Sequence, residues 1–267
     1  PDGITGQSGA NAGSIIFIAE ILHQNDSLVV SNPGPNNMNF IAIGGNGQAG
    51  GAPAPGQPGA TGATGSELTK QLLDDNFFEQ IHIFVRTPPE INHPKLVVHK
   101  VDFDHIDAWK ENLTGNVLFS AMGSTLKSAG SKKAQYKIDV TYQFEVAKAA
   151  AENKVDQLIL VSSVGANQNS IAFYPKIKGL IEEKVKQLKF KCIYILRPPF
   201  LDRGNEKMRD VERISISILN KLNKIGLMRS QKPMSTSFLA SKMIFLAQKK
   251  CNKKSTTLEA KALFELR

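Results

Sequence analysis

Cysteine and tryptophan are scarce in this chain of 267 residues, which has two of the first and one of the second. Cys192 and Cys251 lie far apart and form neither a Cys-x-x-Cys motif nor a Cys/His cluster. We therefore expect free thiols in a reducing compartment, and the five histidines show no metal-ligand spacing. No apolar run reaches about 18 residues, and the apolar segment 14–22 lacks a basic flank. These absences predict a cytoplasmic protein with no metal and no membrane partner.

Basic residues are missing from the first 69 positions, which contain four acidic ones. All 33 lysines and arginines follow, together with 20 of the 24 acidic residues, so this main body carries a net charge of +13. A basic body can attract nucleic acid or an anionic dinucleotide. Because no aromatic residues are interleaved with the basic ones, we expect a small-molecule substrate rather than nucleic acid. A homo-oligomer remains open.

The N-terminal part is rich in glycine, which recurs at every third residue over 3–9 and again over 56–65. These triplets are too few for a stable collagen helix. We assign 1–55 to a glycine-rich extension, within which 38–43 is a candidate first strand of the main domain, and 56–267 to that domain. A fusion near residue 56, a main domain without its first strand, and an adhesive role of the extension are the alternatives.

Two glycine tracts compete as a phosphate loop. Segment 38–43 is followed by Gly45-x-Gly47-x-x-Gly50, a dinucleotide-binding fingerprint, but a proline-containing linker follows it where a helix is needed. The second tract leads directly into a helix over 66–76 with Ser66 as its N-cap, although a linker precedes it. A nucleotide site needs the helix N-terminus. We therefore choose the second tract, and the loop residues are Gly59, Thr61, Gly62, Ala63, Thr64 and Gly65.

Strands and helices alternate regularly after residue 66. The pattern predicts strands at 80–85, 96–101, 117–120, 157–161 and 190–196, and helices at 104–111, 136–153, 174–188, 206–228 and 236–250. Residues 124–135 read as a mobile polar segment. This alternation predicts an α/β fold, with a Rossmann-like doubly wound parallel sheet and helices on both faces. Ligands of such sheets bind at the carboxyl ends of the strands.

Several residues at these strand ends are candidates for cofactor binding. Arg86 ends the strand at 80–85, where an acidic residue would bind a ribose 2′-hydroxyl and an arginine can accommodate a 2′-phosphate. We therefore predict NADP(H) rather than NAD(H). Ala121 and Gly123 follow the strand at 117–120, and such small residues let the backbone pass close to a cofactor. Asp102 either caps the helix expected at 104–111 or lies beside a ligand.

An acid/base device is predicted after the strand at 157–161. Ser163 follows the strand end, and Tyr174 and Lys178 lie four residues apart on one helix, so they share a face. The lysine ammonium favours the ionised phenol, and Tyr174 can then exchange a proton with a substrate oxygen. The Ser163 hydroxyl would hold that oxygen, with Ser162 as the less favoured alternative.

The motifs VSSVGA, YPKIK and LRPPFL at 196–201 resemble the short-chain dehydrogenase/reductase superfamily. They are most similar to its atypical branch, the compact NAD(P)H-binding proteins of the Tat-interacting-protein type, over about 59–250. The resemblance implies an oxidoreductase acting on carbonyls or alcohols by hydride transfer. It also implies that Lys178 binds the nicotinamide ribose, that Asp102 and Phe103 lie beside the adenine, and that Pro198 lies near the nicotinamide.

One motif departs from that family's pattern. Where members usually have Arg-Pro-Gly, this chain has Arg197-Pro198-Pro199, and the second proline removes an N–H donor. A cofactor-sensing or protein-interaction module without catalysis is therefore an alternative, as is an epimerase. The substrate region, 200–250, contains no motif that identifies a substrate.

Overall fold

The computed structural model describes residues 15–21, 41–44, 62–202 and 233–266. Its main feature is an eight-stranded sheet. The strands are β1 (Ile15–Ile21), β2 (Ile41–Gly44), β3 (Phe78–Val85), β4 (Leu96–Lys100), β5 (Val117–Ala121), β6 (Gln157–Val161), β7 (Cys192–Arg197) and β10 (Ser255–Glu259). Most read as apolar runs, as expected for strands covered on both faces.

The strand order identifies a doubly wound sheet. It runs β10-β7-β6-β5-β1-β2-β3-β4, and β2 also pairs directly with β5 in parallel. Without β1, the sequence of neighbours is that of a Rossmann fold, with the direction of winding reversing between β2 and β5. The predicted α/β fold is confirmed, and the crevice for a ligand lies at the ends of these two strands.

Strand β1 is a departure from the parallel sheet. It pairs antiparallel with both β3 and β5, for example Phe17 with Ile83 and with Phe119. The sequence pattern did not predict this strand, which comes from the N-terminal extension. The candidate first strand at 38–43 corresponds to β2, which is parallel to β5 with Gly44 opposite Ala121.

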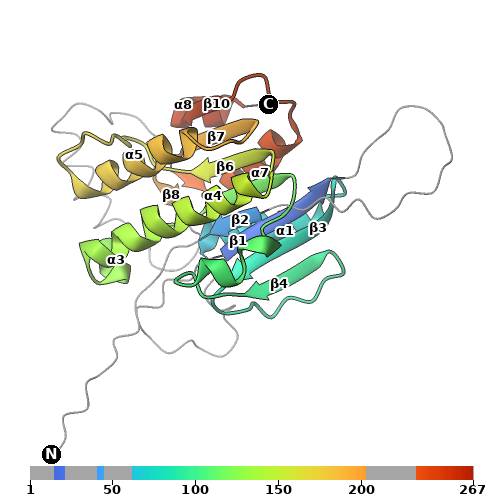
Figure 1. Cartoon of the computed structure of the whole chain (residues 1–267). Helices are drawn as coiled ribbons and strands as arrows, with labels where there is room; N and C mark the ends of the chain where they lie inside the picture. Colours follow the sequence, from blue (N-terminus) through green and yellow to red (C-terminus); the bar gives the residue numbers. More distant parts are fainter. Residues whose placement is uncertain (1–14, 22–40, 45–61, 203–232, 267) are drawn as a thin grey trace, which may run out of the picture.

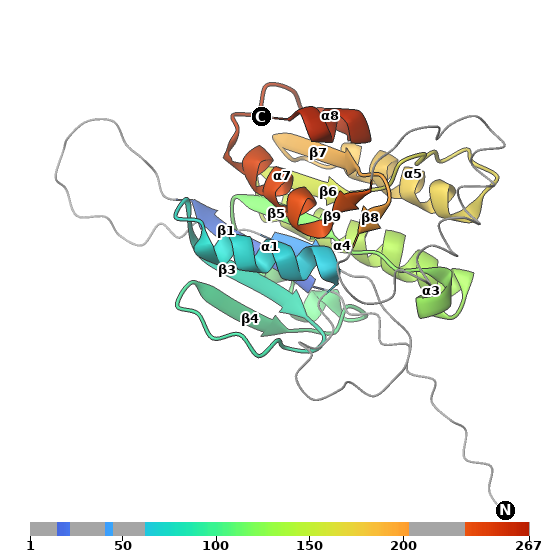
Figure 2. The same ribbon diagram turned by 180° about the vertical axis from the view of Figure 1, so that it is seen from behind.

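Helices cover both faces of the sheet (Figures 1 and 2). On one face lie α4 (Gln143–Glu152) and α5 (Phe173–Lys186), and on the other lie α1 (Ala63–Asp74) and α7 (Thr236–Gln248). The short helix α8 (Ala260–Glu265) follows β10. A separate pair of short parallel strands, β8 (Leu201–Asp202) and β9 (Met234–Ser235), precedes α7.

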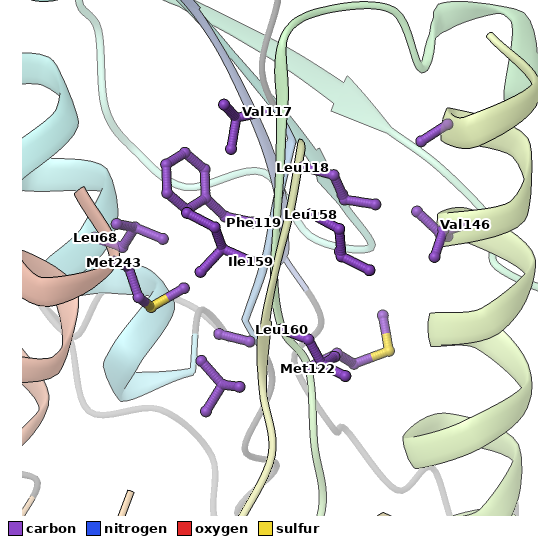
Figure 3. Close-up of a cluster of buried hydrophobic side chains, with 14 of the residues drawn as sticks. Leu68, Val117, Leu118, Phe119, Met122, Val146, Leu158, Ile159, Leu160 and Met243 are labelled. Carbon is purple, nitrogen blue, oxygen red and sulfur yellow. The ribbon is translucent and has the colours of Figure 1, made fainter. Parts of the chain in front are cut away.

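Alternating side chains of β5 and β6 form two apolar layers (Figure 3). Val117, Phe119 and Ile159 point towards Leu68 of α1 and Met243 of α7, whereas Leu118, Leu158 and Leu160 point towards Val146 of α4. All of them are buried. Burying side chains of this size stabilises the fold by roughly 1.5–3 kcal/mol each, which makes the strand ends a rigid base for a site.

Three local predictions were wrong. Helix α1 begins at Ala63 with Gly62 as its N-cap, not at Ser66, because the last residues of the glycine tract already form the first turn. The expected helix at 104–111 is two 3₁₀ turns, η1 (Ile106–Ala108) and η2 (Lys110–Asn112). The supposedly mobile segment 124–135 forms α2 (Leu126–Ala129) and α3 (Lys132–Tyr136), each with a hydroxyl cap from Thr125 or Ser131.

Helix α3 continues into α4 through a π-helical segment, η3 (Lys137–Tyr142). The helix expected at 136–153 therefore begins earlier than predicted and contains an irregular turn. Such π segments are rare and occur often at functional sites. The helix expected at 206–228 lies outside the described residues.

The prediction of free thiols was also wrong. Cys192 at the start of β7 and Cys251 after α7 form a disulfide across 59 residues of sequence. Strand β10 brings them together, since it pairs in parallel with β7 and the Ile193 N–H bonds the Lys254 carbonyl at 2.8 Å. Among the described residues, no helix is long and apolar enough to cross a membrane, and no His/Cys/Asp/Glu group could hold a metal ion.

Candidate functional site

The N-terminus of α1 can receive an anion. The helix begins directly after the buried Gly62, and no side chain from the described part of the chain caps it. Its first turn contains Ala63, Thr64 and Gly65 and no acidic residue. Uncapped N–H groups and the positive end of the helix dipole fit the pyrophosphate of a dinucleotide. Gly59 and Thr61 of the predicted loop lie outside the described residues.

The exit of β5 is fixed by a buried carboxylate. Ala121 and Gly123 are both buried here. The next residue, Ser124, donates its N–H and its hydroxyl to Oδ2 of Asp139, at 2.8 and 2.6 Å. Asp139 lies in η3 and is completely buried. The π-helical segment is thus tied to the strand end that borders the crevice.

The same carboxylate binds Lys178. The Lys178 ammonium lies 2.9 Å from Oδ1 of Asp139, and both side chains are buried. Burial by itself would lower the pKa of Lys178, but the attraction of Asp139, aided by Tyr174 and Glu182, outweighs it and raises the pKa above the ordinary value. Lys178 therefore remains an ammonium ion at neutral pH.

Tyr174 lies at the surface beside this ammonium. Its side chain is 40% exposed, and the Lys178 nitrogen is 5.8 Å from the centre of its ring. The spacing of four residues on α5 thus brings the two groups together, with the amine buried and the phenol open to solvent. A substrate can reach Tyr174, whereas Lys178 is reached only through its neighbours.

The two candidate serines have different surroundings. The Ser162 hydroxyl is buried and donates to Oε1 of Glu182 at 2.5 Å. Glu182 also accepts two hydrogen bonds from Arg197, which in turn bonds Glu259 of β10. This network ties the ends of β6, β7 and β10 to α5. Ser163 is only half buried and makes a long 3.3 Å contact with the Val164 carbonyl, so Ser163 is better placed to meet a ligand.

The loop after Ser163 is shaped by two glycines. Gly165 has a φ of 76°, a left-handed conformation that favours glycine, in a turn closed by the Ala166 N–H and the Ser163 carbonyl. Further on, the loop lies directly against α5 at Gly179, where a Cβ would be 2.1 Å from the Gln168 nitrogen. No other residue fits at Gly179 unless the loop moves. The exit of β7 is adjacent, since the Val164 N–H bonds the Pro198 carbonyl at 3.1 Å.

The adenine side of the predicted site lies at the tips of β3 and β4. The Arg86 guanidinium lies 5.7 Å from the ring centre of Phe103 and 5.5 Å from that of Tyr142. Phe103 is buried, whereas Asp102 is exposed. Hydrogen bonds from the Asp104 N–H and from His105 lower the pKa of Asp102. Asp102 therefore stabilises a turn and does not cap a helix.

Sequence reasoning missed the carboxylates that organise the site. Asp139 and Glu182 are both buried in helices whose inward faces are otherwise largely apolar. The signal available in the sequence was an acid on the apolar stripe: Asp139 precedes the buried Gln143 and Val146 by four and seven residues. An acid at such a position needs a buried partner, and Lys178 is that partner.

The family of this chain follows from its match over residues 59–214 to the model of a family described as NAD(P)H-binding. The chain belongs to this NAD(P)H-binding family. The matched range begins at the second glycine tract and includes α1, Arg86, Tyr174 and Lys178. A nicotinamide dinucleotide is therefore the ligand class of the domain, in agreement with the uncapped start of α1.

Three curated relatives of this family member are fungal proteins. The chain is 34% identical over 151 residues to "Protein FMP52, mitochondrial" of Debaryomyces hansenii, covering 55% of this chain and 66% of the relative. It is 31% identical to "Protein FMP52-1, mitochondrial" of Scheffersomyces stipitis (59% and 71%) and 38% identical to "Protein FMP52, mitochondrial" of Saccharomyces cerevisiae (49% and 58%). The chain thus spans between about six tenths and about seven tenths of the length of these relatives. Because they are named as mitochondrial proteins, the prediction of a cytoplasmic protein was wrong.

Solved structures share the fold of this family member at low sequence identity. MoeE5 in complex with UDP-glucuronic acid and NAD aligns with a TM-score of 0.56 at 13% identity, over 74% of this chain and 73% of that one. The UDP-N-acetylglucosamine 4-epimerase of Methanobrevibacter ruminantium aligns with a TM-score of 0.53 at 18% identity, over 73% and 72%. These likenesses support the Rossmann-like architecture.

Proposed function

We propose that this protein is an NAD(P)H-dependent oxidoreductase of the atypical short-chain dehydrogenase/reductase type, which interconverts a carbonyl compound and its alcohol. The observation that carries the proposal is the contact of Tyr174 with the Lys178 ammonium, which Asp139 holds at the carboxyl ends of β5 and β6. A solvent-accessible phenol beside a buried cation is suited to proton exchange. The relatives' names support a mitochondrial location for this chain as well.

The cofactor would lie across the ends of β2 and β5. Its pyrophosphate would be held at Gly62 to Gly65, its nicotinamide side near Pro198 and Lys178, and its adenine side near Arg86 and Phe103. The bound nicotinamide supplies or accepts the hydride. Arg86 favours a 2′-phosphate and thus NADP(H).

The chain's own residues would handle the proton. In the direction of reduction, the Tyr174 hydroxyl gives its proton to the carbonyl oxygen, and in oxidation the phenolate takes it back. The Lys178 ammonium stabilises the negative charge on the phenol oxygen, and Asp139 keeps the ammonium in place. The Ser163 hydroxyl donates a hydrogen bond to the same substrate oxygen and orients it. Each of these interactions stabilises the transition state more strongly at a site from which water is partly excluded than it would in water.

The test compares Tyr174→Phe with Tyr136→Phe. Tyr136 is similarly exposed, at 36% against 40%, but lies on α3 and not on the helix that carries Lys178. We expect both variants to bind NAD(P)H with the affinity of the wild type in a fluorescence titration. Only Tyr174→Phe should lose carbonyl reduction, by about 10²–10⁴-fold. A rate that survives Tyr174→Phe would exclude the acid/base role. Binding of the cofactor without oxidation by any carbonyl in a broad panel would instead favour a sensor or interaction module.

A further inference from the structure

A carboxylate in the turn after β4 interacts with the charge of the arginine at the tip of β3. Oδ1 of Asp104 accepts a hydrogen bond from the Tyr142 hydroxyl at 2.7 Å and pairs with the Lys137 ammonium at 2.5 Å. The bond from Lys137 and then that from Tyr142 lower the pKa of Asp104, and the charge of Arg86 contributes. Asp104 is therefore ionised at neutral pH and is 45% exposed.

The groups around Asp104 are those that would bind a phosphate. The Lys137 ammonium and the Tyr142 hydroxyl both contact Oδ1 of Asp104, and the charge of Arg86 acts on the same carboxylate. The rings of Phe103 and Tyr142 restrict the guanidinium at the strand tip. An anion position thus exists at the tip of β3, and the chain fills it with its own carboxylate.

No spacing in the sequence indicated this acid. The tip of β3 itself carries Arg86 and Thr87 and no acidic residue. Asp104 comes from the turn after β4, and it reaches Arg86 because β4 pairs with β3 in parallel. The structure therefore supplies both the arginine that accommodates a 2′-phosphate and an acid of the kind that accepts a ribose 2′-hydroxyl.

We propose that Asp104 is a specificity-determining residue that lowers the preference of the site for NADP(H) relative to NAD(H). The inference rests on the proposed function, because it takes a nicotinamide dinucleotide as the ligand. The Asp104 carboxylate can accept a hydrogen bond from a 2′-hydroxyl, whereas it repels a dianionic 2′-phosphate and competes with it for Lys137 and Arg86. Like charges this close disfavour binding of the phosphorylated cofactor.

The test uses Asp104→Asn, with Asp107→Asn as the matched control. Asp107 lies on the following 3₁₀ turn and pairs only at the surface with Lys110, at 2.6 Å. Dissociation constants for NADH and NADPH are measured by fluorescence titration of each variant. We expect Asp104→Asn to shift the NADH/NADPH affinity ratio towards NADPH by about five- to tenfold, and Asp107→Asn to leave it within twofold.

Two further measurements locate the effect. Adenosine 2′,5′-bisphosphate should gain affinity for Asp104→Asn and 5′-AMP should not, which places the change at the 2′ position. Lys137→Gln should shift the ratio in the opposite direction, and it provides a test if Asp104→Asn does not fold. A ratio unchanged in both variants, or shifted equally by Asp107→Asn, would overturn the inference and leave the proposed function standing. A wild-type protein that binds neither NADH nor NADPH would overturn both.

Discussion

Two ionic clusters border the crevice, and they are made of the same kinds of groups. Around Lys178, an ammonium, a carboxylate and a hydroxyl are almost completely enclosed by protein. Around Asp104, the ammonium of Lys137 and the carboxylate are about half exposed, at 49% and 45%, whereas the Tyr142 side chain that supplies the hydroxyl is buried. The distances alone do not separate the two clusters, since the exposed pair is the shorter of the two.

Solvent makes the two clusters differ in their roles. In the buried cluster around Lys178, neither charge can be removed without leaving the other unpaired, so the pair is rigid and its loss destabilises the fold strongly. In the exposed cluster around Asp104, water and salt screen the charges, so a ligand can replace one of the groups at a low cost in free energy. The buried pair is suited to positioning a catalytic group, and the exposed cluster is suited to selecting a cofactor.

The largest expected effect is that of Asp139→Asn. It keeps the size of the side chain but leaves the Lys178 ammonium buried without a counter-charge, so we expect a loss of about 3–5 kcal/mol in the free energy of unfolding. Urea denaturation measures it. Ser124→Ala, which removes only one neutral donor to the same carboxylate, should cost about 1.5–3 kcal/mol, the range for hydrogen bonds to charged groups. If Asp139→Asn cost less than Ser124→Ala, the buried ion pair would not be what stabilises this cluster.

A loss of stability of intermediate size is expected at low pH from the half-buried histidine pair on β3 and β4. His99 lies 2.9 Å from His82, and burial together with the charge of His99 lowers the pKa of His82 to about 4. Because the folded protein favours the neutral His82 ring, the contribution of this group to stability is fully present above its unfolded pKa of about 6.5 and is lost as the pH falls towards 4. Between pH 7.5 and 5 we expect a loss of about 1–2 kcal/mol after allowing for partial exposure.

The control for this pH effect is a histidine in solvent. His82→Gln should remove that part of the pH dependence, whereas His105→Gln, whose side chain is 77% exposed, should leave the dependence as in the wild type. Denaturation curves of the three proteins at both pH values give the comparison. Equal pH dependence in all three would mean that the stacked pair has no role in acid destabilisation.

The parallel strands β2 to β7 could be predicted from the sequence because their residues carry a local signal, whereas β1 and β10 were not predicted. The runs at 117–120 and 157–161 are continuous and apolar, and they form β5 and β6 almost as predicted. Tyr174 and Lys178 share a helix, so a spacing of four residues was enough to bring them together. Local periodicity therefore predicts both the fold and one half of the candidate site.

The partners of the site residues could not be predicted, because each comes from a distant element. Asp139 meets Lys178 only where η3 packs on α5, and Asp104 meets Arg86 only because β3 and β4 are neighbours. Likewise, Cys251 reaches Cys192 only through the pairing of β10 with β7. No spacing rule encodes such contacts, although an acid on an apolar helix face, as at Asp139, does indicate that a partner exists.

The smallest expected effect is that of Lys137→Met, which completes the comparison. It removes the cation that makes the 2.5 Å contact with Asp104, yet the remaining carboxylate is exposed enough for water to solvate it. We therefore expect a loss below about 1 kcal/mol, which should disappear in about 1 M salt, where charges are screened within roughly 3 Å. Urea denaturation at low and high salt provides the measurement, and Asp139→Asn should keep most of its cost at high salt. If Lys137→Met were as costly as Asp139→Asn and as insensitive to salt, exposure would not be what separates the two clusters.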